Sequence, residues 1–361
     1  IINFIKGDIM SRKEKRKKDN KKMKIFVVVT ILIILIAAGI LGYMVLSKNK
    51  DNNEVAINNE NEDETITEVV DDNGIKIFSG NQRPIAVMID NHKGAWPQAG
   101  LKKAYAIYEI IVEGGETRLM AVFKGQDVEK IGPVRSSRHY FLDYALENDA
   151  IYAHYGWSPK AESDIKTLGV NNINGITESD KDFWRIKQKS SPHNVLTSTA
   201  KLKEIAKNKN YKLTSSKKSV LNYVKNEVEL TNGKSANKVT IPYSQLHTTS
   251  YVYDEASKTY TRYARGTKQT DFETNESITT KNIIITFVKN TVLNDGENKD
   301  RQNLSNIGTF KGYYITNGKA IEITCEKSDR KSQTIYKDSN GKEIEVNDGN
   351  TFFNICPIDA N

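Results

Sequence analysis

The chain has 361 residues, of which 38% are hydrophobic and 27% are charged, and its formal net charge is +8. This length suggests about two domains. Ten of the 53 Lys and Arg residues lie in residues 1–46 with only three acidic residues, so the rest of the chain carries 43 basic and 42 acidic side chains. The excess charge belongs to a short tail, and we therefore expect no nucleic-acid partner.

Residues 25–46 form an uncharged apolar run that predicts one transmembrane helix. A helix of this length spans the roughly 30 Å hydrocarbon core of a bilayer. Residues 1–24 form a basic tail in front of it, so the positive-inside rule predicts a single-pass protein of the cell membrane with a cytoplasmic N-terminus and extracellular C-terminal domains. The alternative is a cleaved signal peptide, whose apolar core is usually only about 7 to 15 residues long.

Residues 47–75 are polar, acidic and without apolar periodicity, which predicts a disordered linker. The two cysteines, Cys325 and Cys356, both follow this segment. Because the expected location is extracytoplasmic, they can form a disulfide, but both lie in apolar runs and can equally be buried free thiols. The sequence leaves this choice open.

Apolar strand-like runs alternate with amphipathic helical runs between residues 76 and 208, which predicts an α/β-like domain with a mixed sheet. Strands are expected at 84–89, 105–112, 119–123, 128–134 and 150–155, and helices at 98–104, 136–147, 159–168 and 198–207. The turn-rich sequence EGGETR at 113–118 predicts a hairpin between the second and third of these strands.

From residue 239 to residue 361 the pattern changes to short alternating strands separated by turns. Asn317-Gly318 and Asn340-Gly341 are strong hairpin signals, and this part is expected to be a mostly antiparallel β domain. Residues 209–238, rich in Lys, Asn and Ser, are the expected junction. The fold class predicted for the whole exported part is α+β.

Polar side chains gather where the predicted strands of the first domain end. Asp90, Asn91 and His92 follow the first strand, Glu113 follows the second and His154 ends the strand at 150–155. If these strands run parallel, the groups meet at one edge of the sheet, where open α/β sheets bind ligands. We expect such a site here.

The segment GPVRSSR, residues 132–138, predicts an anion site at the start of a helix. Ser136 can cap the helix, whose free N–H groups favour an anion, and Arg135 and Arg138 suit phosphate or carboxylate. The alternative is an ordinary cap with the arginines paired to Glu113 or Glu116. The predicted ligand-binding residues are Asn91, Arg118, Arg135, Ser136, Arg138 and His193.

Catalysis by a carboxylate pair is a second hypothesis. Glu113 and Glu116 flank a tight turn, and His154 is a candidate base; two carboxyl groups can divide acid and base roles when their surroundings separate their pKa values. A hairpin turn with solvated or Arg-paired glutamates has the same sequence. No HExxH, P-loop or GxGxxG motif is present, so neither a metal nor a cofactor is expected.

Several long strings resemble the YerB-like family, exported bacterial proteins of undetermined activity. They are RPIAVMIDN, WPQAGLKKAYAIYEIIVEGGETRLMAVF, IGPVRSSRHYFLDYALENDAIYAHYGWSP and SPHN, with looser similarity near NIIITF and GKEIEVNDGNTFF. The resemblance implies a two-domain cell-envelope protein and points to the same polar positions. Family members are often lipoproteins, whereas this chain has no lipobox cysteine.

These features predict a membrane-anchored extracytoplasmic protein of a Gram-positive type of envelope. Its expected partner is a cell-wall polymer or another anionic envelope ligand. One alternative is a hydrolase or transferase that acts on wall glycans through Glu113 and Glu116; another is a non-catalytic envelope scaffold.

Overall fold

The computed structural model describes residues 74–358 of the chain. The predicted transmembrane helix at 25–46 and nearly all of the linker at 47–75 lie outside these residues. Within residues 74–358, no helix has the length and apolar character needed to cross a bilayer.

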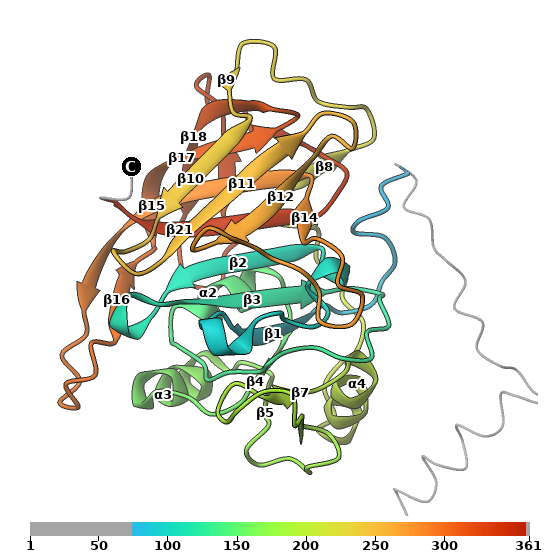
Figure 1. The fold of residues 1–361 in the computed structure, drawn as a ribbon, viewed down its shortest axis with the longest axis vertical. Coiled ribbons are helices and arrows are strands. Elements are labelled where there is room, and N and C mark those ends of the chain that lie inside the picture. Colours follow the sequence, from blue (N-terminus) through green and yellow to red (C-terminus); the bar gives the residue numbers. More distant parts are fainter. Residues whose placement is uncertain (1–73, 359–361) are drawn as a thin grey trace, which may run out of the picture. The chain divides into compact units, whose positions relative to one another are not determined.

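A twelve-stranded mixed sheet runs through the described chain (Figure 1). Ten strands form its continuous path, and β16 and β9 pair at its side. In spatial order the ten strands are β19 (Ile335–Lys337), β18 (Lys319–Lys327), β17 (Gly308–Thr316), β15 (Asn282–Val292), β21 (Thr351–Pro357), β2 (Ala106–Ile111), β3 (Thr117–Phe123), β1 (Ile85–Asp90), β4 (Ile151–His154) and β5 (Asn172–Asn174). The two side strands are β16 (Gln302–Ser305) and β9 (Lys234–Ser235).

The N-terminal and C-terminal halves of the chain share this sheet. Strand β21 lies between β15 and β2 and pairs parallel with both, so it joins the two halves by backbone hydrogen bonds. Strands β1 and β2 are each antiparallel to β3, and β1 is parallel to β4. The carboxyl ends of β1, β2 and β4 therefore lie at the same edge of the sheet, which is the condition on which the expected site depended.

A smaller five-stranded sheet packs over one face of the large sheet. Its strands are β10 (Lys238–Pro242), β11 (Thr248–Asp254), β12 (Thr259–Ala264), β13 (Thr267–Lys268) and β14 (Thr279–Thr280). Two further pairs are β8 (Asn222–Val224) with β20 (Glu345–Asn347), and β6 (Trp184–Arg185) with β7 (Val195–Leu196). The mixed α+β class predicted from the sequence is confirmed.

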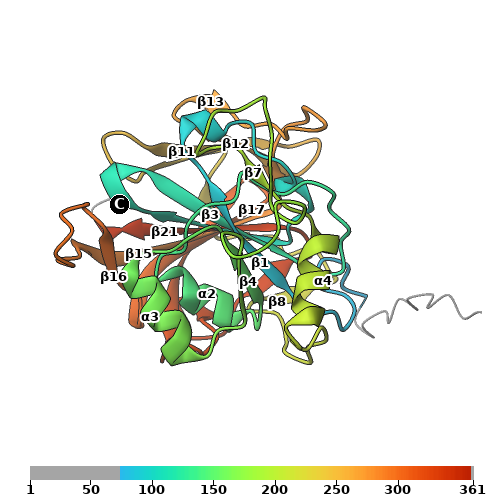
Figure 2. The same ribbon diagram turned by 90° about the horizontal axis from the view of Figure 1, so that it is seen from below.

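Among residues 74–358, three α-helices accompany the sheets: α2 (Phe141–Glu147), α3 (Pro159–Leu168) and α4 (Thr199–Asn208). Figure 2 shows α2 and α3 on the face of the large sheet opposite β11 and β12. Two cores result, because alternate residues of β1 point to opposite faces: Val87 packs towards the small sheet and Met88 towards α2. Burial on both faces explains why β1 is apolar from Ile85 to Ile89, before its last residue, Asp90.

Three predicted elements of the first half are wrong in extent. The helix expected at 98–104 is a single 3-10 turn, Leu101–Lys103. Residues 128–134 form only isolated bridges, such as Ile89 with Val134, instead of a strand. The helix expected from residue 136 begins at Phe141, and its N-cap residue Tyr140 makes no side-chain capping bond. The predicted hairpin is confirmed, with β2 and β3 joined through the 3-10 turn Glu113–Gly115.

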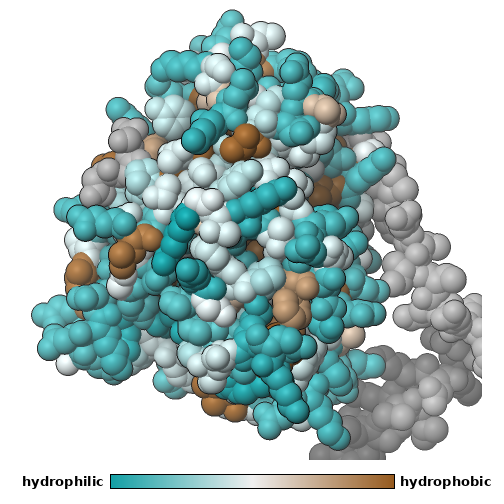
Figure 3. Space-filling view, viewed as in Figure 1, coloured by the Kyte–Doolittle hydropathy of each residue, from teal (hydrophilic) through white to brown (hydrophobic). Residues whose placement is uncertain are grey.

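Both cysteines are buried free thiols, which resolves the choice that the sequence left open. Figure 3 shows hydrophilic residues over most of one face of the molecule, with a few separate hydrophobic residues. Isolated apolar side chains are normal on a water-exposed protein surface.

Candidate anion-binding site

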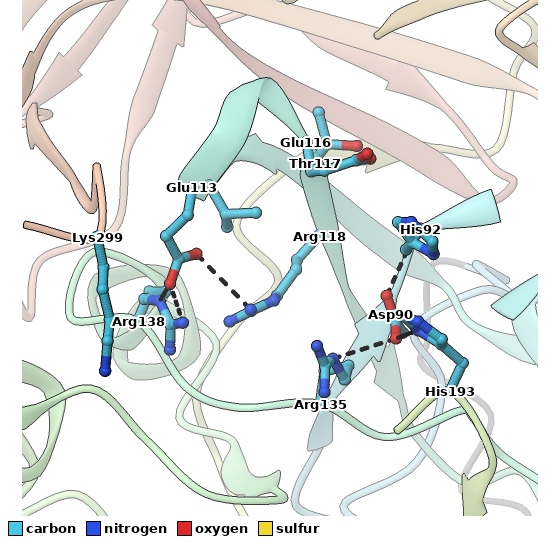
Figure 4. Close-up of a pocket in the computed structure, with 11 residues that line it drawn as sticks. Asp90, His92, Glu113, Glu116, Thr117, Arg118, Arg135, Arg138, His193 and Lys299 are labelled. Carbon is cyan, nitrogen blue, oxygen red and sulfur yellow. Dashed lines mark hydrogen bonds and ion pairs between the residues drawn. The ribbon is translucent and has the colours of Figure 1, made fainter. Parts of the chain in front are cut away.

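An open pocket of about 370 Å³ lies at the edge of the large sheet where β1 and β2 end (Figure 4). Its lining is dominated by charged groups and imidazoles. The lining residues are Asp90, His92, Val112, Glu113, Glu116, Thr117, Arg118, Arg135, Arg138, His193 and Lys299. The structure therefore brings together six of the nine predicted site residues: Glu113, Glu116, Arg118, Arg135, Arg138 and His193.

Asp90, the last residue of β1, organises one side of the pocket. Its Oδ2 accepts a hydrogen bond from Nδ1 of His193 at 2.7 Å and forms an ion pair with Nε of Arg135 at 3.1 Å. Its Oδ1 accepts the backbone N–H of His92 at 3.0 Å. The imidazole of His92 stacks on that of His193, with ring centroids 4.4 Å apart. One buried carboxylate thus fixes an arginine and a histidine at the pocket wall.

Glu113 organises the opposite side of the pocket. Arg138 donates to its Oε1 through Nε at 2.7 Å and also through a second guanidinium nitrogen, and Arg118 lies 3.6 Å from its Oε2. Burial alone would raise the pKa of Glu113, but the positive charges of Arg118 and Arg138 outweigh it and lower the pKa below its usual value. Glu113 is therefore a carboxylate at neutral pH.

Arg118 lies between these two sides, and its side chain is only 9% exposed. Its Nη1 donates to the carbonyl oxygen of Ser136 at 2.8 Å. Burial and the nearby Arg138 lower the pKa of Arg118 to about 10, so the guanidinium still carries its charge at neutral pH. Arg118 is directly opposite Asp90 in the β1–β3 register, which explains why both point to this face.

Two lining residues are paired to groups away from the pocket centre. Glu116 forms an ion pair with Arg265, and Lys299, from the loop between β15 and β16, pairs with Glu297 at 2.9 Å. Each of these pairs is neutral overall. The charge at the centre of the pocket is therefore set by the arginines, Asp90 and Glu113.

A second charged network lies on the other face of the sheet and is fully buried. Its centre is Glu109, which accepts Nη2 of Arg262 at 2.9 Å and contacts Nε2 of His247 at 3.0 Å. The Asn91 amide donates to the same carboxylate at 3.1 Å. Burial would raise the pKa of Glu109, but Arg262 and His247 hold it well below its usual range. This network connects β2 to β11 and β12 of the second half.

Three predicted site residues lie outside the pocket lining. Asn91 belongs to the Glu109 network, because it follows Asp90 by one residue and so points to the opposite face. His154 is fully buried and bonds to the carbonyl oxygen of Gly156 and to Asn172. Ser136 donates to the carbonyl oxygen of Tyr155 and caps no helix, so the expected helix N-terminus is absent from the site.

Asp90 and His92 were expected at this edge of the sheet but were not among the predicted ligand-binding residues, and Lys299 was not expected there at all. The position of Asp90 could have been predicted, because it ends a strand in which alternate residues share a face, and so it lies on the same face as Met88. That of Lys299 could not, because it comes from a loop of the other half. Among residues 74–358, no group of three or more His, Cys, Asp or Glu residues is arranged to hold a metal ion.

Comparison with known proteins identifies the family to which this chain belongs. The chain matches two family domains, each described as a protein of unknown function: the DUF3048 N-terminal domain over residues 74–212 and the DUF3048 C-terminal domain over residues 239–353. The chain belongs to this YerB-like family.

One relative is a Bacillus subtilis (strain 168) protein named "Putative lipoprotein YerB". It is 33% identical over 294 residues, which cover 77% of this chain and 83% of the relative. The crystal structure of YerB from Bacillus subtilis is similar, with a TM-score of 0.69 and 31% identity, over 78% of this chain and 93% of that one.

Proposed function

We propose that this protein is anchored in the cell membrane and binds an anionic ligand of the cell envelope in the Asp90–Glu113 pocket. The observation that carries the proposal is the convergence of Arg118, Arg135 and Arg138 on one open pocket. Guanidinium groups suit phosphate and carboxylate, and a partly buried site screens their charge less than open solvent does.

Placement in the envelope is supported by two observations. Residues 25–46 have the length and apolar character of a membrane span. The relative YerB bears the name of a lipoprotein, which is a membrane-attached class of protein. We propose that an N-terminal helix anchors this chain in the membrane, as an acyl group anchors a lipoprotein.

Cysteine labelling in intact cells tests this topology. Cys325 and Cys356 are buried and burial raises the pKa of Cys325 to about 12, so the native thiols give little background. A membrane-impermeant maleimide should label Asn58→Cys but should label Ser11→Cys only after lysis. Labelling of Ser11→Cys in intact cells would overturn the proposed orientation.

Ligand binding is tested by calorimetry on the full-length chain in detergent at low salt. The ligands are fragments of phosphate-containing and of carboxylate-containing wall polymers. Arg135→Ala should weaken binding by about tenfold to a hundredfold, because one charge-assisted hydrogen bond contributes about 1.5 to 3 kcal/mol. Lys268→Ala removes one exposed positive charge elsewhere and should change little. No binding of either polymer class would end the proposal.

The geometry gives little support to glycan hydrolysis by Glu113 and Glu116. A general acid needs a raised pKa, whereas that of Glu113 is lowered, and Glu116 is paired with Arg265. His154 is buried beside Gly156 and Asn172. Release of glycan fragments from purified cell walls, lost in Glu113→Gln and in Glu116→Gln, would reverse this conclusion.

A further inference from the structure

One end of the pocket is bordered by two segments whose only charged residues are Lys and Arg. Figure 4 shows His92 and His193 at this end and Lys299 at the other. The segments meet at the pocket, because the two imidazoles stack with ring centroids 4.4 Å apart. The segments are residues 91–101 and 183–198, which contain no Asp or Glu, and their charged residues are Lys93, Arg185, Lys187 and Lys189.

A cation lies next to each of the stacked histidines. Lys93 directly follows His92 and is exposed, in a 3-10 turn that begins there. Arg185, the last residue of β6, donates through Nη1 to Oδ1 of Asn194 at 2.7 Å, and Asn194 directly follows His193. Both cations therefore lie just beyond the residues that line the pocket.

Further contacts hold Arg185 and its segment close to the pocket. The guanidinium of Arg185 lies 5.5 Å from the centre of the Tyr155 ring, and the backbone N–H of Tyr155 donates to the carbonyl oxygen of Arg135 at 3.0 Å. Nζ of Lys189 donates to the carbonyl oxygen of Trp96 at 2.9 Å, which joins the two bordering segments. Arg185 is thus connected to an arginine of the pocket wall as well as to the histidines.

The cations outside the pocket differ from those inside it in having no carboxylate partner. Arg135 of the pocket pairs with Asp90. Lys93, Arg185 and Lys187, which we call the flanking cations, are exposed and form no ion pair within the described part of the chain. A small anion that fills only the pocket leaves these three charges uncompensated. A longer ligand that passes the histidines brings a second negative charge to them.

We infer that the ligand is a linear polymer with repeated anionic groups, one in the pocket and the next against the flanking cations. This inference rests on the proposed function and specifies its ligand class. Two contacts with one chain reinforce each other, because binding of the first group holds the second group close to its own site. The shared chemistry is the row of anionic groups, and the experiment has separate arms for phosphodiester and for carboxylate units.

The experiment compares chains with their single units by calorimetry on the full-length protein in nonionic detergent at neutral pH and low salt. The carboxylate arm uses galacturonate and its hexamer, and the phosphodiester arm uses glycerophosphoglycerol and a hexamer of glycerol phosphate. Affinities are expressed per anionic unit, which removes the statistical advantage of a longer chain. In at least one arm, we expect the hexamer to bind at least about tenfold more tightly than the single unit.

A triple variant tests the flanking cations. Lys93→Ala/Arg185→Gln/Lys187→Ala should weaken binding of the hexamer about tenfold, whereas binding of the single unit should change by less than about twofold. Retained binding of the single unit also shows that the pocket is folded. If the triple variant does not fold, the exposed single variants Lys93→Ala and Lys187→Ala replace it, and each should weaken binding of the hexamer about threefold.

A second triple variant controls for the loss of net charge. Lys238→Ala/Lys268→Ala/Lys311→Ala removes three exposed cations of β10, β13 and β17, none of which lines the pocket. Both affinities should stay within about twofold of those of the unaltered protein. An equal loss of hexamer binding in the two triple variants would overturn the inference, because the position of the cations would then have no effect.

The remaining outcomes distinguish the inference from the proposed function. Hexamers that bind no more tightly per unit than single units would overturn the inference. Anion binding in the pocket would still stand if Arg135→Ala weakened binding of the single unit. Failure of all four probes to bind would overturn both.

Discussion

Glu109 is a carboxylate without solvent contact, and its partners come from both halves of the chain. Removing its charge leaves the guanidinium of Arg262 buried and uncompensated. We expect Glu109→Gln to lower the free energy of unfolding by about 3 to 5 kcal/mol. Urea denaturation of the full-length chain measures this. Glu322→Gln, which breaks an exposed pair with Lys234, should cost less than about 1 kcal/mol; equal effects would contradict the central role of Glu109.

His154 has a structural role that pH can reveal. Burial lowers its pKa to about 4, from 6.5, so the folded protein binds fewer protons than the unfolded chain between these values. The contribution of neutral His154 to the free energy of unfolding is therefore fully present above pH 6.5, and it is lost as the pH falls from 6.5 towards 4. We expect that His154 contributes about 2 kcal/mol to the loss of stability between pH 7 and pH 5. In His154→Gln that loss should be smaller by this amount, and the same pH dependence in both proteins would contradict the assignment.

Asp90 and Asn91 show how far the site could be predicted from residues alone. The sequence placed both at the end of a strand, and the shared direction of β1, β2 and β4 confirmed that such ends meet. Adjacent residues of a strand point to opposite faces, so only Asp90 reaches the pocket. Which face would hold the ligand depended on how the second half packs, and local sequence carries no information on that packing.

At the scale of elements, the two Asn-Gly turns provide a matched comparison. Gly318 and Gly341 both have positive φ, 72° and 78°, which favours glycine. A Cβ on Gly318 would lie 2.9 Å from the Tyr253 ring, whereas a Cβ on Gly341 would meet nothing within 4 Å. Gly341→Ala should therefore cost about 1 kcal/mol, and Gly318→Ala clearly more. Thermal melts of both variants test the difference; equal losses would show that Tyr253 moves aside freely.

The start of α2 shows why one element was misplaced. Ser136 and Ser137 are common capping residues, but their hydroxyls contact Tyr155 and Tyr152 instead of the backbone of a helix. The serines and the arginines that flank them belong to no helix or strand, and α2 begins only at Phe141. Tertiary hydrogen bonds to the β4 region outweighed a local preference for capping. In the second half, the Asn317-Gly318 hairpin between β17 and β18 was predicted correctly.

For the whole molecule, the shared sheet predicts cooperative unfolding. Strand β2 pairs with β21 over five residues, and the Glu109 network adds charged contacts between the halves. All three tryptophans, Trp96, Trp157 and Trp184, lie in the first half, whereas far-UV circular dichroism reports strands of both. We expect the two signals to change at one denaturant concentration. Two separated transitions would show that the halves fold independently.

The position of β21 also has a consequence for biosynthesis. This strand occupies the middle of the large sheet, yet it is the last strand of the described chain to be synthesised and, in the proposed topology, the last to cross the membrane. Until then β2 has an open edge and no neighbour on that side, although its hairpin partner β3 is already made. Before β21 is available, the backbone N–H and C=O groups on this edge of β2 are unpaired. We expect the chain at this stage to depend most on chaperones and to be most prone to misassembly.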